Sequence, residues 1–160
     1  MADTQPGAAV GEATVFHFAK NAHIHRFTLP RRSSGPLNSV DNEVIIAITG
    51  ETDYATIQEL QEGTQRIVEG CQAYWGGAPH DFFFINIIAF PNQEPNNTGG
   101  NGIHRGLNAM IPQRDMKSEY NTNPVWAEEY GWPLINKEEI LSFLAHEYSH
   151  YWYSIILPEY

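Results

Sequence analysis

Two histidines and a glutamate near the carboxyl end of the chain have the types and spacing of a metal-dependent hydrolytic site. His146 and His150 are four residues apart, and Glu147 directly follows the first of them. On a helix, residues four apart share one face with their Cβ atoms about 5–6 Å apart, so both imidazoles can bind one zinc ion. Glu147 would accept a proton from a water molecule as the general base. The pattern therefore predicts a site for one Zn²⁺ ion and metal-assisted hydrolysis.

The helix that must carry this site has sequence signals at both ends. Asn136 can cap it, Glu139 completes the spacing of a capping box, and Pro158 cannot continue it beyond about Leu157. Glu147 is surrounded in the sequence by large apolar residues: Phe143, Leu144, Tyr148, Tyr151 and Trp152. We therefore expect this helix to be buried on nearly all of its faces. A buried carboxylate and two buried imidazoles need partners, and a metal is one such partner. In the alternative interpretation, both histidines are core residues satisfied by ordinary hydrogen bonds.

The remaining pattern predicts a sheet and a second long helix. The expected strands are residues 14–18, 23–29, 44–49, 81–90 and 102–111. An apolar stripe predicts a helix over about 53–74, which Gly76 and Pro79 end. Segments 91–101 and 112–136 are expected to be irregular. This order predicts an α+β domain in which the long helix and the histidine-bearing helix pack on a mixed sheet.

Composition excludes several classes of protein. The chain has 160 residues, nine basic and nineteen acidic, with a formal net charge of −10, which predicts one domain and no nucleic-acid partner. No apolar run approaches the roughly 20 residues of a membrane span, and no signal peptide is visible, so the compartment stays unknown, cytoplasmic by default. A single cysteine, Cys71, excludes an internal disulfide and falls on the apolar stripe of the long helix.

Two segments carry a resemblance to a known family. Residues 144–152, LAHEYSHYW, resemble the zinc-site helix of the M61 peptidases, the glycyl aminopeptidase-like metallopeptidases. Residues 74–79, YWGGAP, with the strands on either side of the long helix, resemble the entry into that family's catalytic domain. The resemblance covers roughly residues 27–158. It implies a thermolysin-like (gluzincin) domain that hydrolyses peptide bonds, with His146 and His150 as zinc ligands and Glu147 as the base.

The family also implies a third zinc ligand, for which this sequence shows no match. In the family this ligand is a glutamate on a later helix, further beyond His150 than this sequence extends. Glu159 is too near to replace it, because a helix rising 1.5 Å per residue would put it about 13 Å away. We therefore expect residues 27–160 to be a catalytic domain truncated after the histidine-bearing helix, preceded in 1–26 by a loose terminus and the end of a β-region. The last helix would then meet a missing carboxyl-terminal half or self-associate.

A third segment is similar to the family's edge strand, which pairs with bound peptide. Residues 100–104, GNGIH, match its G-G-L-E-H-like segment except that Ile103 stands where a glutamate would hold a free amino terminus. The resemblance implies that Gly102, Ile103 and His104 contact a peptide or protein substrate, and it leaves aminopeptidase specificity open. His104 is equally compatible with an ordinary surface histidine. Two alternatives stay open for the chain: an inactive peptide-binding module, or an inactive fragment without its third zinc ligand.

Overall fold

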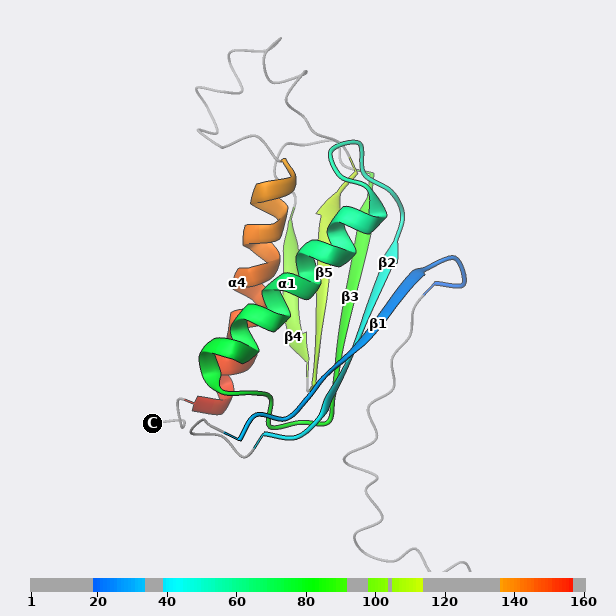
Figure 1. The fold of residues 1–160 in the computed structure, drawn as a ribbon. Helices are drawn as coiled ribbons and strands as arrows, with labels where there is room; N and C mark the ends of the chain where they lie inside the picture. Colours follow the sequence, from blue (N-terminus) through cyan, green and yellow to red (C-terminus); the bar gives the residue numbers. More distant parts are fainter. Residues whose placement is uncertain (1–18, 34–38, 92–97, 104, 114–135, 157–160) are drawn as a thin grey trace, which may run out of the picture.

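A computed structural model describes residues 19–33, 39–91, 98–103, 105–113 and 136–156. Within them the chain forms one mixed sheet with two helices on one face (Figure 1). The elements are β1 His23–Leu29, β2 Asn42–Thr49, α1 Ile57–Trp75, β3 Phe82–Phe90, β4 Gly99–Ile103, β5 Gly106–Pro112 and α4 Lys137–Ile156. The predicted α+β class with a mixed sheet is confirmed. The expected strand 14–18 and nearly all of the irregular segment 112–136 lie outside the described residues.

The five strands lie in the order β1-β2-β3-β5-β4. Strands β2, β3 and β5 are parallel, while β1 and β4 run antiparallel to their neighbours at the two edges. Helix α1 provides the crossover from β2 to β3, as parallel neighbours require. β4 pairs with β5 alone among the described strands and lies beside α4, so the edge of the sheet and the histidine-bearing helix are adjacent.

The single strand predicted over 102–111 is wrong. The chain reverses between Ile103 and Gly106, so that β4 and β5 form an antiparallel hairpin. Arg105 adopts φ 56°, a left-handed conformation that is uncommon without glycine and that the sequence did not reveal. Residues 99–101, predicted as loop, belong to β4.

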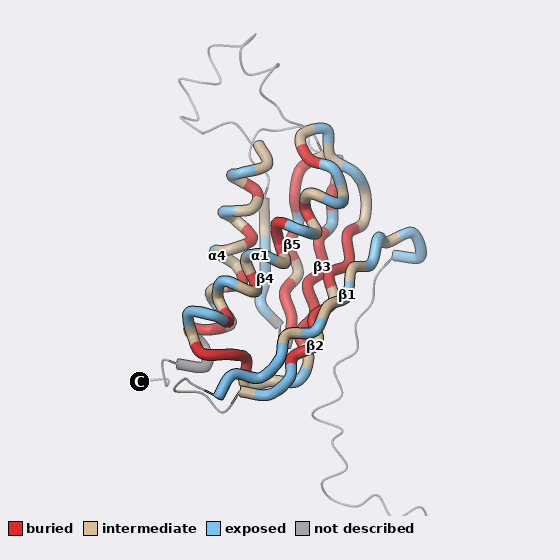
Figure 2. The backbone as a smooth tube through the Cα atoms, in the orientation of Figure 1, coloured by how far each residue is buried: buried red, intermediate tan, exposed pale blue. Residues whose placement is uncertain are grey.

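The core lies between the sheet and the two helices. Alternate residues of β2, β3 and β5 face the helices, because side chains along a strand alternate between its two faces. The buried positions along these three strands are the red segments in Figure 2. The fully buried residues of this layer include Val44, Ile46, Ile48, Ile85, Ile87 and Ile111. The central strands therefore form a rigid base for the edge strand and for α4.

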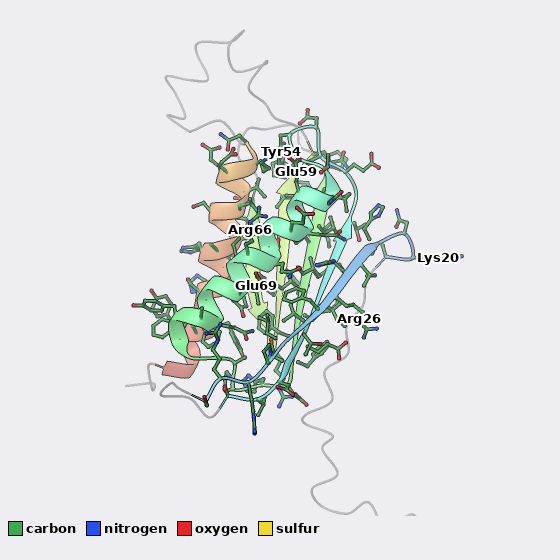
Figure 3. All side chains as sticks on the ribbon, in the orientation of Figure 1. Lys20, Arg26, Tyr54, Glu59, Arg66 and Glu69 are labelled. Atoms are coloured by element: carbon green, nitrogen blue, oxygen red, sulfur yellow. The ribbon has the colours of Figure 1, made fainter. Side chains whose placement is uncertain are left out.

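Helix α1 begins later than predicted, at Ile57 instead of residue 53. Thr56 caps it: its hydroxyl accepts from the Glu59 N–H at 3.1 Å, and the Glu59 carboxylate accepts from the Thr56 N–H at 2.9 Å. The N–H of Asp53 instead donates to the Gln113 carbonyl, so this segment pairs with the end of β5 and cannot join the helix. Polar side chains, including Arg66 and Glu69, lie along α1 (Figure 3).

The two ends of the long helix are fixed in different ways. Lys137 at the start of α4 forms an ion pair with Glu59 at 3.0 Å. The N–H of Thr56 and the ammonium of Lys137 hold the pKa of the Glu59 carboxyl below its ordinary value. At the other end, Gly76 takes a left-handed conformation with φ 87°, and its N–H and that of Gly77 both donate to the Gln72 carbonyl. The predicted glycine stop is confirmed.

Helix α4 has the predicted capping box. The Glu139 N–H donates to the Asn136 side-chain oxygen at 3.0 Å, and the Asn136 N–H donates to the Glu139 carboxylate at 3.2 Å. The helix is described to Ile156, one residue short of the predicted end. Neither α1 nor α4 is long and apolar enough to cross a membrane, which agrees with the sequence for the part of the chain described.

Removing the α1 cap should destabilise the domain measurably. Thr56→Ala deletes the hydroxyl that accepts from Glu59, and loss of such a cap costs about 1 kcal/mol. We expect a lower urea midpoint with an unchanged slope, followed by circular dichroism. Thr56→Ser keeps the hydroxyl and should unfold close to the wild type. Equal midpoints for Thr56→Ala and Thr56→Ser would contradict a stabilising role for the cap.

Candidate metal centre

The three residues of the H-E-x-x-H motif lie together in the middle of α4. One ligand atom from each of His146, Glu147 and His150 lies within 4.8 Å of the other two. The Nε2 atoms of the two histidines are 3.2 Å apart, and their rings stand nearly perpendicular, at 88°. Both imidazoles therefore aim the same nitrogen at a common point, as the helical spacing predicted.

This geometry fits a shared zinc ion. Two nitrogens bound to tetrahedral zinc at about 2.0–2.1 Å are themselves about 3.3 Å apart. The 3.2 Å between the Nε2 atoms of His146 and His150 is close to that value. The same distance also permits a hydrogen bond if one imidazole carries its proton on Nε2, so a metal and this proton compete for one position. Imidazole nitrogens are ligands that suit zinc.

The expectation that α4 is buried all round is wrong. Its buried residues form one stripe at four-residue spacing: Ile140, Leu144, Tyr148 and Trp152. His146 and His150 are exposed on another face, and Glu147 is half-buried. The desolvation argument for a metal partner does not apply to the histidines, because they are hydrated. The case for a metal rests instead on the spacing of the two nitrogens, and the site is open to solvent.

The edge strand approaches Glu147 at a glycine. A methyl group placed on Gly100 would lie 2.7 Å from the Glu147 carboxyl carbon and 2.7 Å from one of its oxygens. Such contacts are shorter than van der Waals distance, so the carboxylate occupies the space that a side chain at position 100 would fill. Sequence analysis treated Gly100 only as part of the edge segment and missed this role. No local pattern could have indicated this contact, because Gly100 and Glu147 are 47 positions apart in the sequence.

The structure brings the predicted edge segment beside the motif in part. Gly102 lies on β4 on the same face as Gly100, with open space where its Cβ would be. Ile103 ends the strand and pairs with Gly106, but its side chain is not among those described. His104 lies outside the described residues. The predicted contacts of Gly102, Ile103 and His104 with substrate stay predictions.

No third protein ligand joins the histidines within the described residues. Glu147 is the acid that completes the group of three, and no other histidine, cysteine, aspartate or glutamate of the described segments is part of it. Glu159, which the sequence placed too near to replace the family's third ligand, lies outside those segments.

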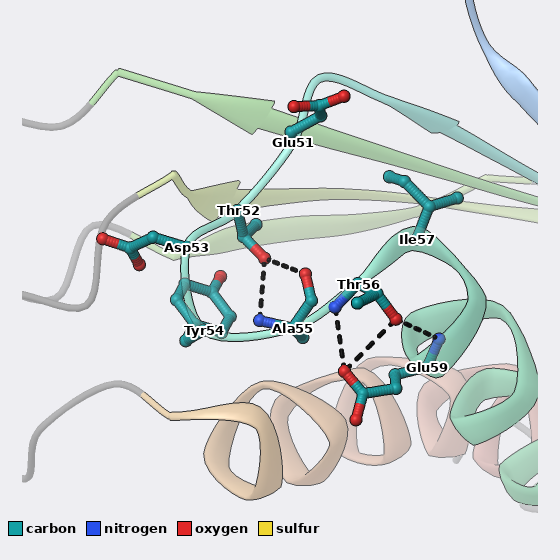
Figure 4. A pocket seen from close by; sticks show the side chains of 8 residues that line it. All are labelled: Glu51, Thr52, Asp53, Tyr54, Ala55, Thr56, Ile57 and Glu59. Atoms are coloured by element: carbon teal, nitrogen blue, oxygen red, sulfur yellow. Dashed lines mark hydrogen bonds between the residues drawn. The ribbon is translucent and has the colours of Figure 1, made fainter.

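Two other features do not belong to this centre. Cys71 packs against the core from α1, and burial raises the pKa of its thiol, which agrees with a structural thiol and not a nucleophile. A cavity of about 460 Å³ lies at the start of α1, lined by residues 51–57 and Glu59 (Figure 4). The Thr52 hydroxyl there donates to the Ala55 carbonyl at 2.8 Å, and Glu59 belongs to the helix cap. These polar groups are engaged in local turn and cap bonds.

Comparisons with known proteins add little to the geometry. No family model matches the sequence, and no curated protein matches it. Among solved structures, the chain is similar to an aminopeptidase N family protein from Idiomarina loihiensis, at 13% sequence identity and a TM-score of 0.46. The match covers 82% of this chain and 18% of that one, so the chain spans less than a fifth of that protein's length. A similarity this weak carries no weight in the argument, and the resemblance to M61 peptidases stays untested.

The metal centre makes a direct prediction about zinc content. The purified protein should hold about one zinc ion per chain by elemental analysis, and His150→Ala should lose it, because one of the two aligned nitrogens is gone. His23→Ala is the matched control, since His23 is an exposed histidine on β1, a strand that does not carry the motif. Equal zinc in all three proteins would place the ion elsewhere, and none in any would mean that the described ligands do not suffice.

Proposed function

We propose that this protein is a zinc-dependent metallopeptidase domain of thermolysin-like, M61-like type. The observation that carries the proposal is the 3.2 Å approach of the His146 and His150 Nε2 atoms, with Glu147 between them in sequence and against the edge strand in space. The resemblance of residues 144–152 to the M61 zinc helix adds sequence support.

The residues of the centre divide the chemistry between them. His146 and His150 would hold the zinc ion, which when bound would supply Lewis acidity to a water molecule and to a peptide carbonyl. Glu147 accepts the proton of the attacking water and passes it to the nitrogen of the departing amine. Its half-buried carboxylate fills the space left by the missing side chain of Gly100, on the side of α4 nearest the sheet edge. Exposure of both histidines leaves room for a substrate to approach.

The edge strand suggests how a peptide would be oriented. The backbone groups of β4 on the side away from β5 are not paired with another described strand. An extended peptide can add to such an edge through main-chain hydrogen bonds. Gly102 and Ile103 lie along this edge, and Gly100 lies opposite the base, so a peptide paired there would pass beside Glu147. We propose an extended peptide or protein segment as substrate.

A second function has specific observations in its favour. Ile103 stands where M61 peptidases carry a glutamate, and no third metal ligand lies among the described residues. Both points favour a module that binds peptides on β4 without cleaving them. The peptidase proposal requires a third ligand that the described residues do not supply.

The role of Glu147 can be tested by an isosteric change. Glu147→Gln removes the base while His146 and His150 are kept, so the variant should keep its zinc and lose at least about 100-fold in kcat on a mixture of quenched fluorescent peptides. Glu138→Gln, an exposed glutamate in the first turn of the same helix, is the matched control. Undiminished turnover in Glu147→Gln would sink the assignment of the base. Peptide binding without turnover in the wild type would favour the binding module.

A pair of glycine substitutions tests the contact between Glu147 and the edge strand. Gly100→Ala puts a methyl group 2.7 Å from the Glu147 carboxylate, which must move, whereas a methyl group on Gly102 meets no atom within 4 Å. Because displacing a catalytic group by about 1 Å can cost 100-fold, Gly100→Ala should lower kcat at least about tenfold with zinc content unchanged. Gly102→Ala should lower it far less. Equal rates for the two variants would contradict this role of Gly100.

A further inference from the structure

The segment between α1 and β3 is held in place through its own main-chain carbonyls. They accept hydrogen bonds from residues 40–43, where β2 begins. The Val40 N–H donates to the Ala78 carbonyl at 3.0 Å, and the Glu43 N–H donates to the Asp81 carbonyl at 2.8 Å. Between them, the Asn42 side-chain amide donates to the His80 carbonyl at 2.7 Å. Residues 78–81 therefore form a platform, fixed at three points to the start of β2.

Two buried side-chain amides also hold this platform in place. Asn42 is fully buried and Gln72 of α1 is 3% exposed. The Gln72 amide nitrogen donates to the Asn42 side-chain oxygen at 2.8 Å, so both ends of the Asn42 amide are engaged. A buried amide costs free energy unless its bonds are made, so this arrangement tolerates little displacement of His80.

From this platform, His80 reaches the helix that carries the metal centre. The His80 Nδ1 atom and the Tyr151 hydroxyl are 2.7 Å apart, and Tyr151 follows His150 directly in α4. The Tyr151 ring packs on Phe83 with centroids 4.5 Å apart. When the His80 Nδ1 atom carries no proton, the Tyr151 hydroxyl donates to it.

The next residue of the platform reaches the hairpin that contains the edge strand. Asp81 forms an ion pair with Arg105, in the turn between β4 and β5, at 3.1 Å. The Asp81 side chain is 75% exposed, so this bond contributes little to stability. Two consecutive residues, His80 and Asp81, thus contact the histidine-bearing helix and the hairpin beside it, and the half-buried His80–Tyr151 bond is the stronger constraint.

We infer that His80 and Tyr151 are positioning residues for the metal centre. The inference rests on the proposed function, because it assigns them the task of holding α4 at the rotation and height that align His146 and His150. Neither acts on substrate. Their bond fixes the helix one residue beyond His150, and a small rotation there would move both Nε2 atoms and the Glu147 carboxylate relative to Gly100. No local pattern indicates this pair, because its members are 71 positions apart.

The experiment uses the full chain and Co²⁺ as a visible probe of the site. Tyr151→Phe removes only the hydroxyl and keeps the ring contacts, so we expect Co²⁺ to bind roughly tenfold more weakly, with an altered visible spectrum. Tyr153→Phe, an exposed tyrosine on the same helix, is the matched control and should behave as the wild type. His80→Leu should weaken binding as Tyr151→Phe does, and the double variant should be no weaker than the singles, because one bond is lost in each. His80→Asn, with a polar atom near the Nδ1 position, should recover part of the affinity.

A metal-free measurement separates this inference from the proposed function. Imidazole NMR signals of His146 and His150, recorded without metal, should shift in Tyr151→Phe and not in Tyr153→Phe. Shifted signals in a protein that binds no Co²⁺ would refute the zinc site and support the positioning role. Unshifted signals in Tyr151→Phe would overturn the positioning role, provided that any Co²⁺ affinity and visible spectrum are also unchanged. A lower melting temperature of Tyr151→Phe would not rescue it.

Discussion

The packing of one stripe of α4 against the sheet and α1 sets the geometry of everything near the candidate site. Ile140, Leu144, Tyr148 and Trp152 are each at most 1% exposed, and burial of an aliphatic side chain such as Ile140 or Leu144 contributes about 1.5–3 kcal/mol. Burial of this stripe sets the overall rotation of α4, and the His80–Tyr151 bond then holds the helix beside His150. A residue two positions along a helix lies on nearly the opposite side, so burial of Leu144 and Tyr148 forces the two histidines of the motif outward.

Glu147 takes a different direction for the same reason. It precedes Tyr148 by one residue, about 100° around the helix, and so faces sideways toward the edge of the sheet. There it meets Gly100, whose missing side chain makes room for the carboxylate. The proposed base, the histidine pair and the free edge of β4 are therefore brought together by packing and not by contacts among themselves. Rigid elements carry all of them, which is what a site that must hold its geometry requires.

Local signals predicted the elements with strong periodicity or caps. The capping box at Asn136, the glycine stop at Gly76 and the motif spacing at His146 depend only on neighbouring residues, and each is present as expected. Errors occurred where partners far along the chain decided the structure. The segment at Asp53 pairs with Gln113 instead of entering α1, and Arg105 turns the chain without a glycine to mark it. The predicted burial of α4 failed because apolar content does not say which face has a neighbour.

Neighbouring residues were enough to predict the histidine-bearing helix, its cap at Asn136, and the i, i+4 pair that brings two imidazole nitrogens to one point, because helical geometry needs no other part of the chain. The contacts of Gly100 with Glu147 and of His80 with Tyr151 depend instead on tertiary packing. These contacts join residues 47 and 71 positions apart, as the numbering shows. They exist because the crossover of α1 and the turn at Arg105 place the platform and the edge strand beside α4, and no local pattern encodes that arrangement.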